Sequence, residues 1–163
     1  GDYLQPTVSA DHGEWHLEAR YNYEERDTAS LWGGWNLSFG KHVTLDLTPM
    51  LGVVFGDADG IAPGMELTLA WKSLVYYGES EYFFDTEDHE SNYFYAWTEV
   101  SWQQPDWLRY GLAMQRTRAY QSNLDFQIGP MAGFSVGKTE IAVYYFNPTH
   151  EEAFAVLTAS IEF

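Results

Sequence analysis

The chain has 163 residues, a mass of 18.7 kDa and a formal net charge of −16, from 24 acidic and 8 basic residues. This length suits one domain with a single interior, and the acidic balance repels nucleic-acid phosphates, so DNA and RNA are excluded as partners. The sequence has no cysteine, which excludes disulfides, thiolate metal sites and cysteine nucleophiles.

Apolar and polar side chains alternate from Glu14 onward, and this period of two predicts β-strands with two different faces. No segment has convincing helical spacing, so the predicted fold class is all-β. Residues 1–13 fit the alternation poorly and are expected to form an N-terminal tail or a small plug, separate from one β-domain of residues 14–163. The pattern predicts about ten strands, at residues 14–24, 30–39, 43–55, 65–71, 74–85, 92–103, 107–119, 123–136, 139–147 and 153–163.

Two prolines, Pro49 and Pro130, fall inside predicted strands. Proline has no backbone N–H to donate to a strand ladder. Each is therefore predicted to mark a bulge or an irregular stretch.

The predicted connections alternate strictly between long and short. The longer ones carry many acids and cover residues 25–29, 56–64, 86–91, 120–122 and 148–152. The short ones cover residues 40–41, 72–73, 104–106 and 137–138, and all three lysines lie at such turns. This alternation predicts an up-and-down antiparallel barrel with short turns at one end and longer loops at the other. An even number of strands would place both termini at the short-turn end.

Aromatic side chains gather near both ends of the apolar strand faces, as is typical of strands that cross a membrane. Near the short turns they are Trp15, Phe39, Trp71, Tyr76, Trp102, Tyr110, Phe134 and Phe163. Near the longer loops they are Tyr23, Phe55, Phe84, Phe94 and Tyr145.

The sequence ends on an amphipathic strand whose apolar face includes Leu157, Ile161 and Phe163. In this strand and in its loop asymmetry the chain resembles the bacterial outer-membrane β-barrel proteins. The resemblance implies a transmembrane barrel in the bacterial outer membrane, with lipid and lipopolysaccharide around its apolar face. It also implies that Phe163 and Ile161 form the signal read by the barrel-assembly machinery.

The opposite face would then line the interior, and it is rich in charge. A rough register places Glu66 opposite Glu79, Glu79 opposite Glu99, and Arg109 opposite Ser101. Like charges that face each other need compensation, which an ion-pair network, a protonated carboxylate or a bound cation would each supply. The predicted interior charge cluster is Glu18, Arg20, Asp46, Glu66, Glu79, Glu99 and Arg109, with Glu18 and Asp46 on one level.

Several aromatic rings share that interior face, which argues against a wide pore. The predicted function is therefore a structural or narrow, channel-like barrel, porin-like, with an acidic and cation-selective interior. Arg116 and Arg118 continue the apolar face toward the longer loops, where they would either contact lipopolysaccharide phosphates or be solvated.

Two other functions stay open. A soluble barrel would turn the apolar face inward and bind a hydrophobic ligand. An outer-membrane enzyme would use an acid and histidine site on the loop rim, from Asp57, Asp59, Asp88 and His89. No catalytic, metal-binding or cofactor motif supports the enzyme, so we expect a protein without catalysis and without cofactors.

Overall fold

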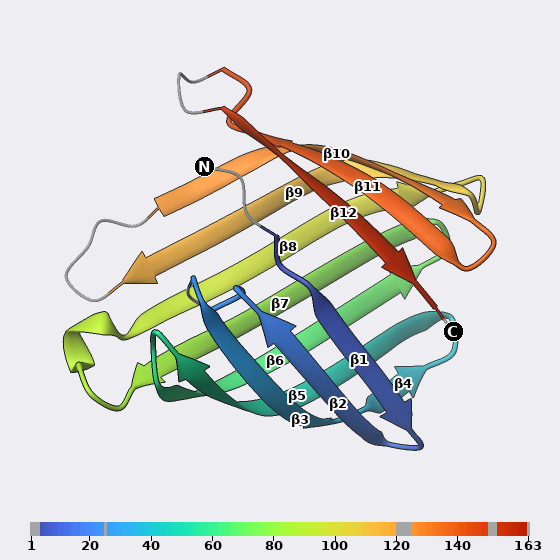
Figure 1. Cartoon of the computed structure of the whole chain (residues 1–163). Helices are drawn as coiled ribbons and strands as arrows, with labels where there is room; N and C mark the ends of the chain where they lie inside the picture. Colours follow the sequence, from blue (N-terminus) through green and yellow to red (C-terminus); the bar gives the residue numbers. More distant parts are fainter. Residues whose placement is uncertain (1–3, 25, 120–124, 150–152, 163) are drawn as a thin grey trace.

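The computed structural model describes residues 4–24, 26–119, 125–149 and 153–162. They form a single antiparallel sheet that curves strongly (Figure 1). Strands adjacent in the sequence are neighbours in the sheet, in the order β1-β2-β3-β5-β6-β7-β8-β9-β10-β11-β12, and β4 pairs with β5. The predicted all-β, antiparallel, up-and-down topology is confirmed.

The described residues form twelve strands and one short 3₁₀ turn, η1 (His89–Ser91). The strands are β1 (Thr7–His12), β2 (Trp15–Tyr21), β3 (Thr28–Trp35), β4 (Leu37–Gly40), β5 (Val43–Gly56), β6 (Gly60–Trp71), β7 (Leu74–Asp85), β8 (Tyr93–Gln103), β9 (Leu108–Ala119), β10 (Asp125–Val136), β11 (Thr139–Phe146) and β12 (Phe154–Ile161).

Two differences separate these twelve strands from the ten or so expected. First, residues 7–12 of the expected tail or plug form β1, which pairs with β2 along its whole length. Six residues make a short alternation, which explains why the pattern was weak. Second, the strand expected at residues 30–39 is divided into β3 and β4, although both parts keep the same register on β5.

Proline explains the division of that strand. Gly34 pairs with Met50 and Leu37 with Leu47, so Trp35 lies opposite Pro49, which has no N–H to donate. Pro130 has a similar effect, because the β10–β11 pairing begins only at Met131. The predicted irregularity is confirmed at both prolines, as an interrupted ladder without a shift of register.

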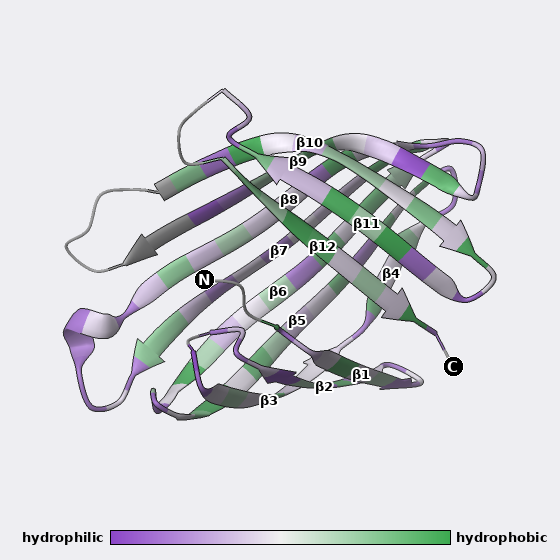
Figure 2. Cartoon of the chain, turned by 45° about the horizontal axis from the view of Figure 1, so that its top comes forward, coloured by the Kyte–Doolittle hydropathy of each residue, from purple (hydrophilic) through white to green (hydrophobic). Residues whose placement is uncertain are grey.

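The two faces of the sheet differ in chemistry. On β2 the side chains of His16, Glu18 and Arg20 are buried on the concave side, whereas Leu17 and Ala19 are exposed on the convex side. Green and purple alternate along the strands in Figure 2, which shows the same pattern over the whole sheet. Two small apolar clusters lie on the concave side: Trp32, Met50, Val54, Ala62 and Phe83, and Ala113, Met131, Ala142, Tyr144 and Phe146.

The sheet is not closed, because within the described residues β1 and β12 are its two unpaired edges. Their arrowheads point toward the same end of the sheet (Figure 1). The path from one edge to the other has eleven strands, an odd number, so β1 and β12 run in the same direction. The start of β1 and the end of β12 therefore lie at opposite ends of the sheet.

Candidate functional site

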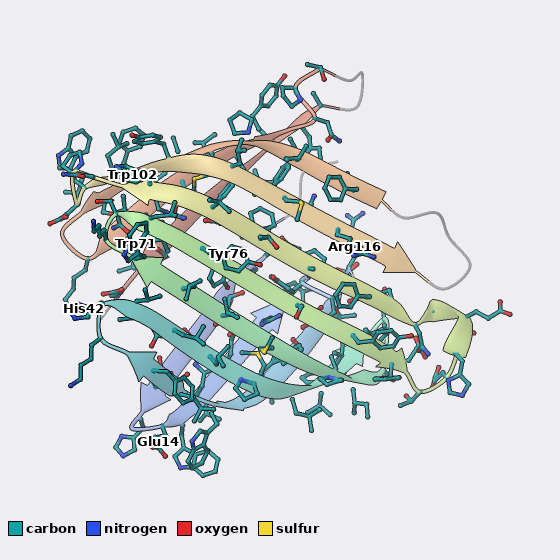
Figure 3. The ribbon with its side chains drawn as sticks, turned by 180° about the vertical axis from the view of Figure 1, so that it is seen from behind. Glu14, His42, Trp71, Tyr76, Trp102 and Arg116 are labelled. Carbon is teal, nitrogen blue, oxygen red and sulfur yellow. The ribbon has the colours of Figure 1, made fainter. Side chains whose placement is uncertain are left out.

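The convex face carries exposed aromatic rings near the short turns. Trp71 and Trp102 lie together at that end, where His42 and Glu14 also project (Figure 3). Farther round the sheet, the rings of Trp15 and Trp35 meet edge to face with centroids 4.5 Å apart. Large apolar side chains are exposed along most strands of this face, which is the reverse of the usual arrangement in a protein surrounded by water.

The concave face holds a group of buried charges centred on Arg20. The Arg20 guanidinium donates through Nε to Glu18, and its Nη1 lies 3.0 Å from Glu81 and 3.1 Å from Glu79. The Arg20 side chain is only 2% exposed. Charge-assisted hydrogen bonds of this kind are strong, and they fix the guanidinium in one orientation. We call these four residues the Arg20 group.

Aromatic rings enclose the Arg20 guanidinium. Its central carbon lies 4.3 Å from the ring centroid of Tyr23 and 4.4 Å from that of Trp32. The Met50 sulfur lies 3.8 Å from its Nη2. These cation–π contacts occupy the faces of the guanidinium while its edges hold the carboxylates.

Glu79 connects the Arg20 group to its neighbours. Its carboxylate accepts hydrogen bonds from the hydroxyls of Tyr23, at 2.8 Å, and Tyr77, at 3.4 Å. Burial and the Glu79 carboxylate raise the pKa of the Tyr23 hydroxyl well above its ordinary value, so Tyr23 stays a donor. Glu66 pairs directly with Glu79 across β6 and β7, as the sequence predicted.

His16 extends the group toward β1. Its Nδ1 lies 2.8 Å from Asp11 and its Nε2 lies 3.2 Å from Glu18. Asn36 also donates to Asp11, at 2.6 Å. These bonds tie β1 to the rest of the sheet through polar side chains on the concave side.

Glu24 contributes a further buried carboxylate, in the connection between β2 and β3. Its Oε1 accepts from the Ser30 hydroxyl at 2.6 Å and from the Trp32 indole at 3.1 Å. Its Oε2 has no hydrogen-bond partner in the described part of the chain. The Tyr93 hydroxyl, from β8, donates to the Glu24 backbone carbonyl at 2.6 Å. This bond joins the loop between β2 and β3 to β8, which lies several strands away in the sheet.

A second group of charges is centred on Arg109. The guanidinium donates to Glu99 through Nη1 and to Glu140 through Nε and Nη2, the latter two at 3.0 and 2.8 Å. Glu99 also accepts from the Tyr144 hydroxyl and the Trp97 indole, both at 2.8 Å. We call Arg109, Glu99, Glu140 and Tyr144 the Arg109 group.

A cavity of about 310 Å³ borders the Arg109 group. Its lining is mainly polar: Thr68, Val75, Tyr77, Glu99, Ser101, Gln103, Arg109 and Glu140. The Arg109 side chain is 19% exposed and that of Glu140 is 28% exposed, so water reaches this group more easily than it reaches Arg20.

Parts of the predicted register were wrong. The structure pairs Glu79 with Trp97 rather than with Glu99. The reason lies in the β7–β8 loop, where η1 and a hydrogen bond from the Asp85 amide to the Asn92 side chain shape the connection.

Arg109 pairs with Gln103 rather than with Ser101. The turn that precedes Arg109 is longer than the three residues expected, because the Leu108 amide bonds back to the Pro105 carbonyl. Arg109 nevertheless reaches Glu99, because its long side chain spans the difference.

Asp46 lies outside both groups. It pairs with Ser38, whose hydroxyl donates to it at 2.6 Å. Glu18 pairs with Trp32, so Glu18 and Asp46 do not share a level as predicted. The structure thus brings Glu18, Glu66, Glu79 and Arg20 together on one side of the concave face and Glu99 with Arg109 on the other.

Several residues of the two groups were absent from the predicted cluster. Glu81 and Glu140 follow the same alternation as the acids that were included. Trp97 and Glu99 are two residues apart on one strand face, the spacing at which side chains are neighbours. Tyr23 was expected among the aromatic rings of the apolar face, and this was wrong: β2 ends at Tyr21 and Asn22 has a positive φ, so Tyr23 turns to the concave side and bonds to Glu79. Tyr144 was not in the predicted cluster, because its partner Glu99 comes from a distant strand.

The remaining predicted residues lie on the convex side or beyond the described part. Arg116 is exposed, and its guanidinium carbon lies 5.9 Å from the Phe94 ring centroid; Figure 3 shows it on β9, away from the tryptophan end. Ile161 is exposed at the end of β12. The side chain of Arg118, and Phe163 as a whole, lie outside the described residues.

The acids of the loop rim have local roles. Asp88 accepts from the Glu90 amide and the Ser91 hydroxyl and so caps η1. Asp59 accepts from the Gly56 amide at 3.4 Å. Among residues 4–24, 26–119, 125–149 and 153–162, no three histidine or acidic side chains are placed to hold a metal ion.

Comparisons with models of protein families, with curated proteins and with solved structures gave no match. Within the described residues, no helix has the length and apolar character needed to cross a membrane.

Proposed function

We propose that the chain is an integral β-barrel of a bacterial outer membrane, with a narrow, acidic and largely filled interior. One observation carries the proposal: apolar side chains are exposed on the convex side, while arginine and glutamate are buried on the concave side. In water, so many exposed apolar side chains would be unfavourable, whereas the buried charges are already paired with one another. In a bilayer, the apolar side faces lipid and the charges pair inside.

Membrane insertion requires that the sheet close, because the bilayer core offers no water to unpaired backbone groups. We propose that β1 and β12 pair with each other. Both edges present small apolar side chains outward, such as Ala10 and Ala159, and hydroxyls inward, such as Ser9 and Ser160. Because the two strands run in the same direction, the seam is parallel (Figure 1).

Cysteine cross-linking tests the seam in a sequence that has no native cysteine. Ala10→Cys is combined with Leu157→Cys, Ala159→Cys or Ile161→Cys, all on the outward face. Under oxidation, we expect one of these pairs to form an intramolecular disulfide. Cross-linking from Leu17→Cys on β2 instead would mean that β12 displaces β1. Dimers linked at Ala10 would mean that the edges join two copies.

Gel mobility with and without boiling, on protein folded in detergent, tests the membrane proposal itself. We expect a heat-dependent shift in mobility, together with β-rich circular dichroism only in detergent or lipid. A monomer that is folded and β-rich in plain buffer would contradict it and would favour the soluble alternative. That alternative has less support, because the cavity on the concave side is lined by charged and hydroxyl side chains rather than apolar ones.

The interior supports a structural role or a narrow path better than a wide pore. The Arg20 group and the rings of Trp32 and Phe83 are buried on the concave side. Planar-bilayer recordings separate the two roles: small, cation-selective currents would indicate a path, whereas absent conductance would leave a structural barrel. Outer-membrane lipid is the proposed surrounding of the apolar face, with Arg116 beside lipopolysaccharide phosphates, and the terminal strand is the proposed signal for the assembly machinery.

A further inference from the structure

The connection between β2 and β3 begins with a short segment that folds toward the concave side. Asn22 has a positive φ of 56°, which turns the chain just after the end of β2. The side chains of Tyr23 and Glu24 then lie on the concave side, and Glu24 is only 7% exposed. From β8, the Tyr93 hydroxyl holds the Glu24 carbonyl at 2.6 Å. We call residues 22–24 the inward segment.

The Glu24 carboxyl group is bonded on one oxygen only. Its Oε1 accepts from the Ser30 hydroxyl at 2.6 Å and from the Trp32 indole at 3.1 Å. Its Oε2 is enclosed by the protein and has no hydrogen-bond partner among the described residues. The ion pairs of these residues include none at Glu24. An ionised carboxylate with a buried, unpaired oxygen is strongly unfavourable, so this oxygen calls for positive charge.

The uneven bonding of the two oxygens is the pattern of a neutral carboxylic acid. In the acid, the carbonyl oxygen accepts hydrogen bonds and the other oxygen carries the proton. At Glu24 both donors are directed at Oε1, which matches the carbonyl oxygen. A water molecule or a metal ion has no room beside the enclosed Oε2, whereas a proton needs none.

The surrounding charges also favour the neutral form. Glu81 on β7 is 3% exposed, and its charge and that of Glu24 repel each other across the concave side. Arg20 does not compensate Glu24, because its three nitrogens contact the other members of the Arg20 group and the Met50 sulfur. The other described charged side chains of this connection and of the β5–β6 connection are exposed: Arg26, Asp27, Asp57 and Asp59.

We propose that Glu24 is a proton-binding site that holds the inward segment in place. With a proton on Oε2, the segment is uncharged and stays folded on the concave side. When that proton passes to water, an unpaired charge is left near Glu81, and the segment moves toward the solvent at the rim. The proton site needs only the fold described above, whereas control of an ion path by the segment would rest on the proposed membrane barrel.

Infrared spectroscopy of the protein folded in detergent, at neutral pH, tests for the proton directly. A neutral carboxylic acid has a carbonyl band that is separate from the carboxylate bands and shifts in D₂O. We expect Glu24→Gln to remove the contribution of one acid to this band. Glutamine still offers a carbonyl oxygen to Ser30 and Trp32, so both bonds are kept. Glu87→Gln, on the exposed rim, is the matched control and should leave the band unchanged.

The Trp32 indole reports on the same site, because its N–H donates to Glu24 Oε1. In ¹⁵N-labelled protein, we expect its resonance to shift in a single step as the pH is raised, and we expect this step to be absent in Glu24→Gln. The Trp97 indole, which donates to Glu99 in the Arg109 group, is the internal control and should not follow that step.

The pH dependence of unfolding counts the proton. An unfolded glutamate is ionised above a pH of about 4.3, so folding takes up one proton at Glu24. As the pH rises, the unfolding equilibrium constant of the unchanged protein should therefore increase about tenfold per pH unit relative to that of Glu24→Gln, until the folded protein loses the proton. A ratio that does not depend on pH would contradict the proposal.

The proposal is also overturned if Glu24→Gln keeps the full acid band or if the Trp32 step persists in that variant. If Glu24→Gln does not fold, the unchanged protein decides: the acid band must weaken over the pH range of the Trp32 step, and a Trp32 resonance that does not move would overturn the proposal. Failure of the membrane proposal is seen separately, in gel mobility and circular dichroism, and the same spectra are then recorded on the monomer in plain buffer.

Discussion

Two arginines organise the charges of the concave side, and their surroundings differ. Arg20 is 2% exposed, contacts three carboxylates and lies between two aromatic rings. Arg109 is 19% exposed, contacts two carboxylates and borders a cavity. The chemistry is the same in both groups, but access to water is not.

This difference separates two functions of a buried ion pair. Where water is excluded, an arginine neutralises carboxylates that have no other partner, so it is required for the fold. Where a cavity is adjacent, water or a cation can replace part of that arginine. The Arg20 group is therefore the structural centre of the interior, and the Arg109 group is the part able to exchange with solvent.

The largest expected effect comes from Arg20→Gln. This change leaves Glu18, Glu79 and Glu81 buried without their cation, which costs about 3–5 kcal/mol of unfolding free energy. The measurement is urea-induced unfolding followed by tryptophan fluorescence, in lipid vesicles. Arg116→Gln on the convex side is the matched control and should change the unfolding free energy by less than about 0.5 kcal/mol. Equal losses in the two variants would contradict the assignment of Arg20 as the centre.

Arg109→Gln should cost less, about 2 kcal/mol, because water from the cavity reaches the Glu99 and Glu140 carboxylates after the change. The same unfolding measurement applies. A loss as large as that of Arg20→Gln would mean that the cavity offers no solvent to these carboxylates, and the comparison between the two groups would fail.

The strand pattern was predictable because alternation is local. Leu17, Glu18, Ala19 and Arg20 show their faces in the sequence itself, and the structure confirms those faces. The arginine contacts were not predictable in detail. Arg20 and Glu81 are 61 residues apart, and whether they meet depends on every turn between them.

Turn geometry caused the errors in register. When a turn is two residues longer than expected, each residue of the following strand pairs with a residue two positions away from the expected partner. Arg109, expected opposite Ser101, therefore lies opposite Gln103. Side-chain parity survives such an error because the step is even. Inward residues were therefore identified well, while the identities of their partners were not.

The next effect in size concerns the ring that supports Arg20. A Cβ added at Gly52 would lie 2.5 Å from the Trp32 ring, so Gly52→Ala must displace that ring. We expect a loss of about 1–3 kcal/mol in the unfolding measurement. Gly33→Ala is the control, because a Cβ there meets nothing within 4 Å.

A double-mutant cycle connects Gly52→Ala to the comparison. Its effect should couple with that of Arg20→Gln, because Trp32 contacts the Arg20 guanidinium, and should add independently to that of Arg109→Gln. If Gly52→Ala couples as strongly with Arg109→Gln as with Arg20→Gln, the Arg20 and Arg109 groups respond as one unit.

The smallest expected effects come from two tyrosine hydroxyls that each donate to a buried carboxylate. Tyr23 donates to Glu79 and Tyr144 donates to Glu99, both at 2.8 Å. Removal of either hydroxyl takes one hydrogen bond from a carboxylate, which costs about 1 kcal/mol when nothing replaces it. Cavity water can replace the Tyr144 hydroxyl at Glu99, so Tyr144→Phe should cost less than Tyr23→Phe.

Both substitutions delete a hydroxyl that donates at 2.8 Å, and Tyr144 also accepts a longer bond from Arg109, so their difference in unfolding free energy reports water access together with that second bond. The order Tyr23→Phe above Tyr144→Phe supports an Arg20 group without water and an Arg109 group in contact with it. The reverse order would mean that Tyr144, which also accepts from Arg109 at 3.2 Å, orders its group by accepting as well as donating. The structural role would then belong to the Arg109 side of the interior.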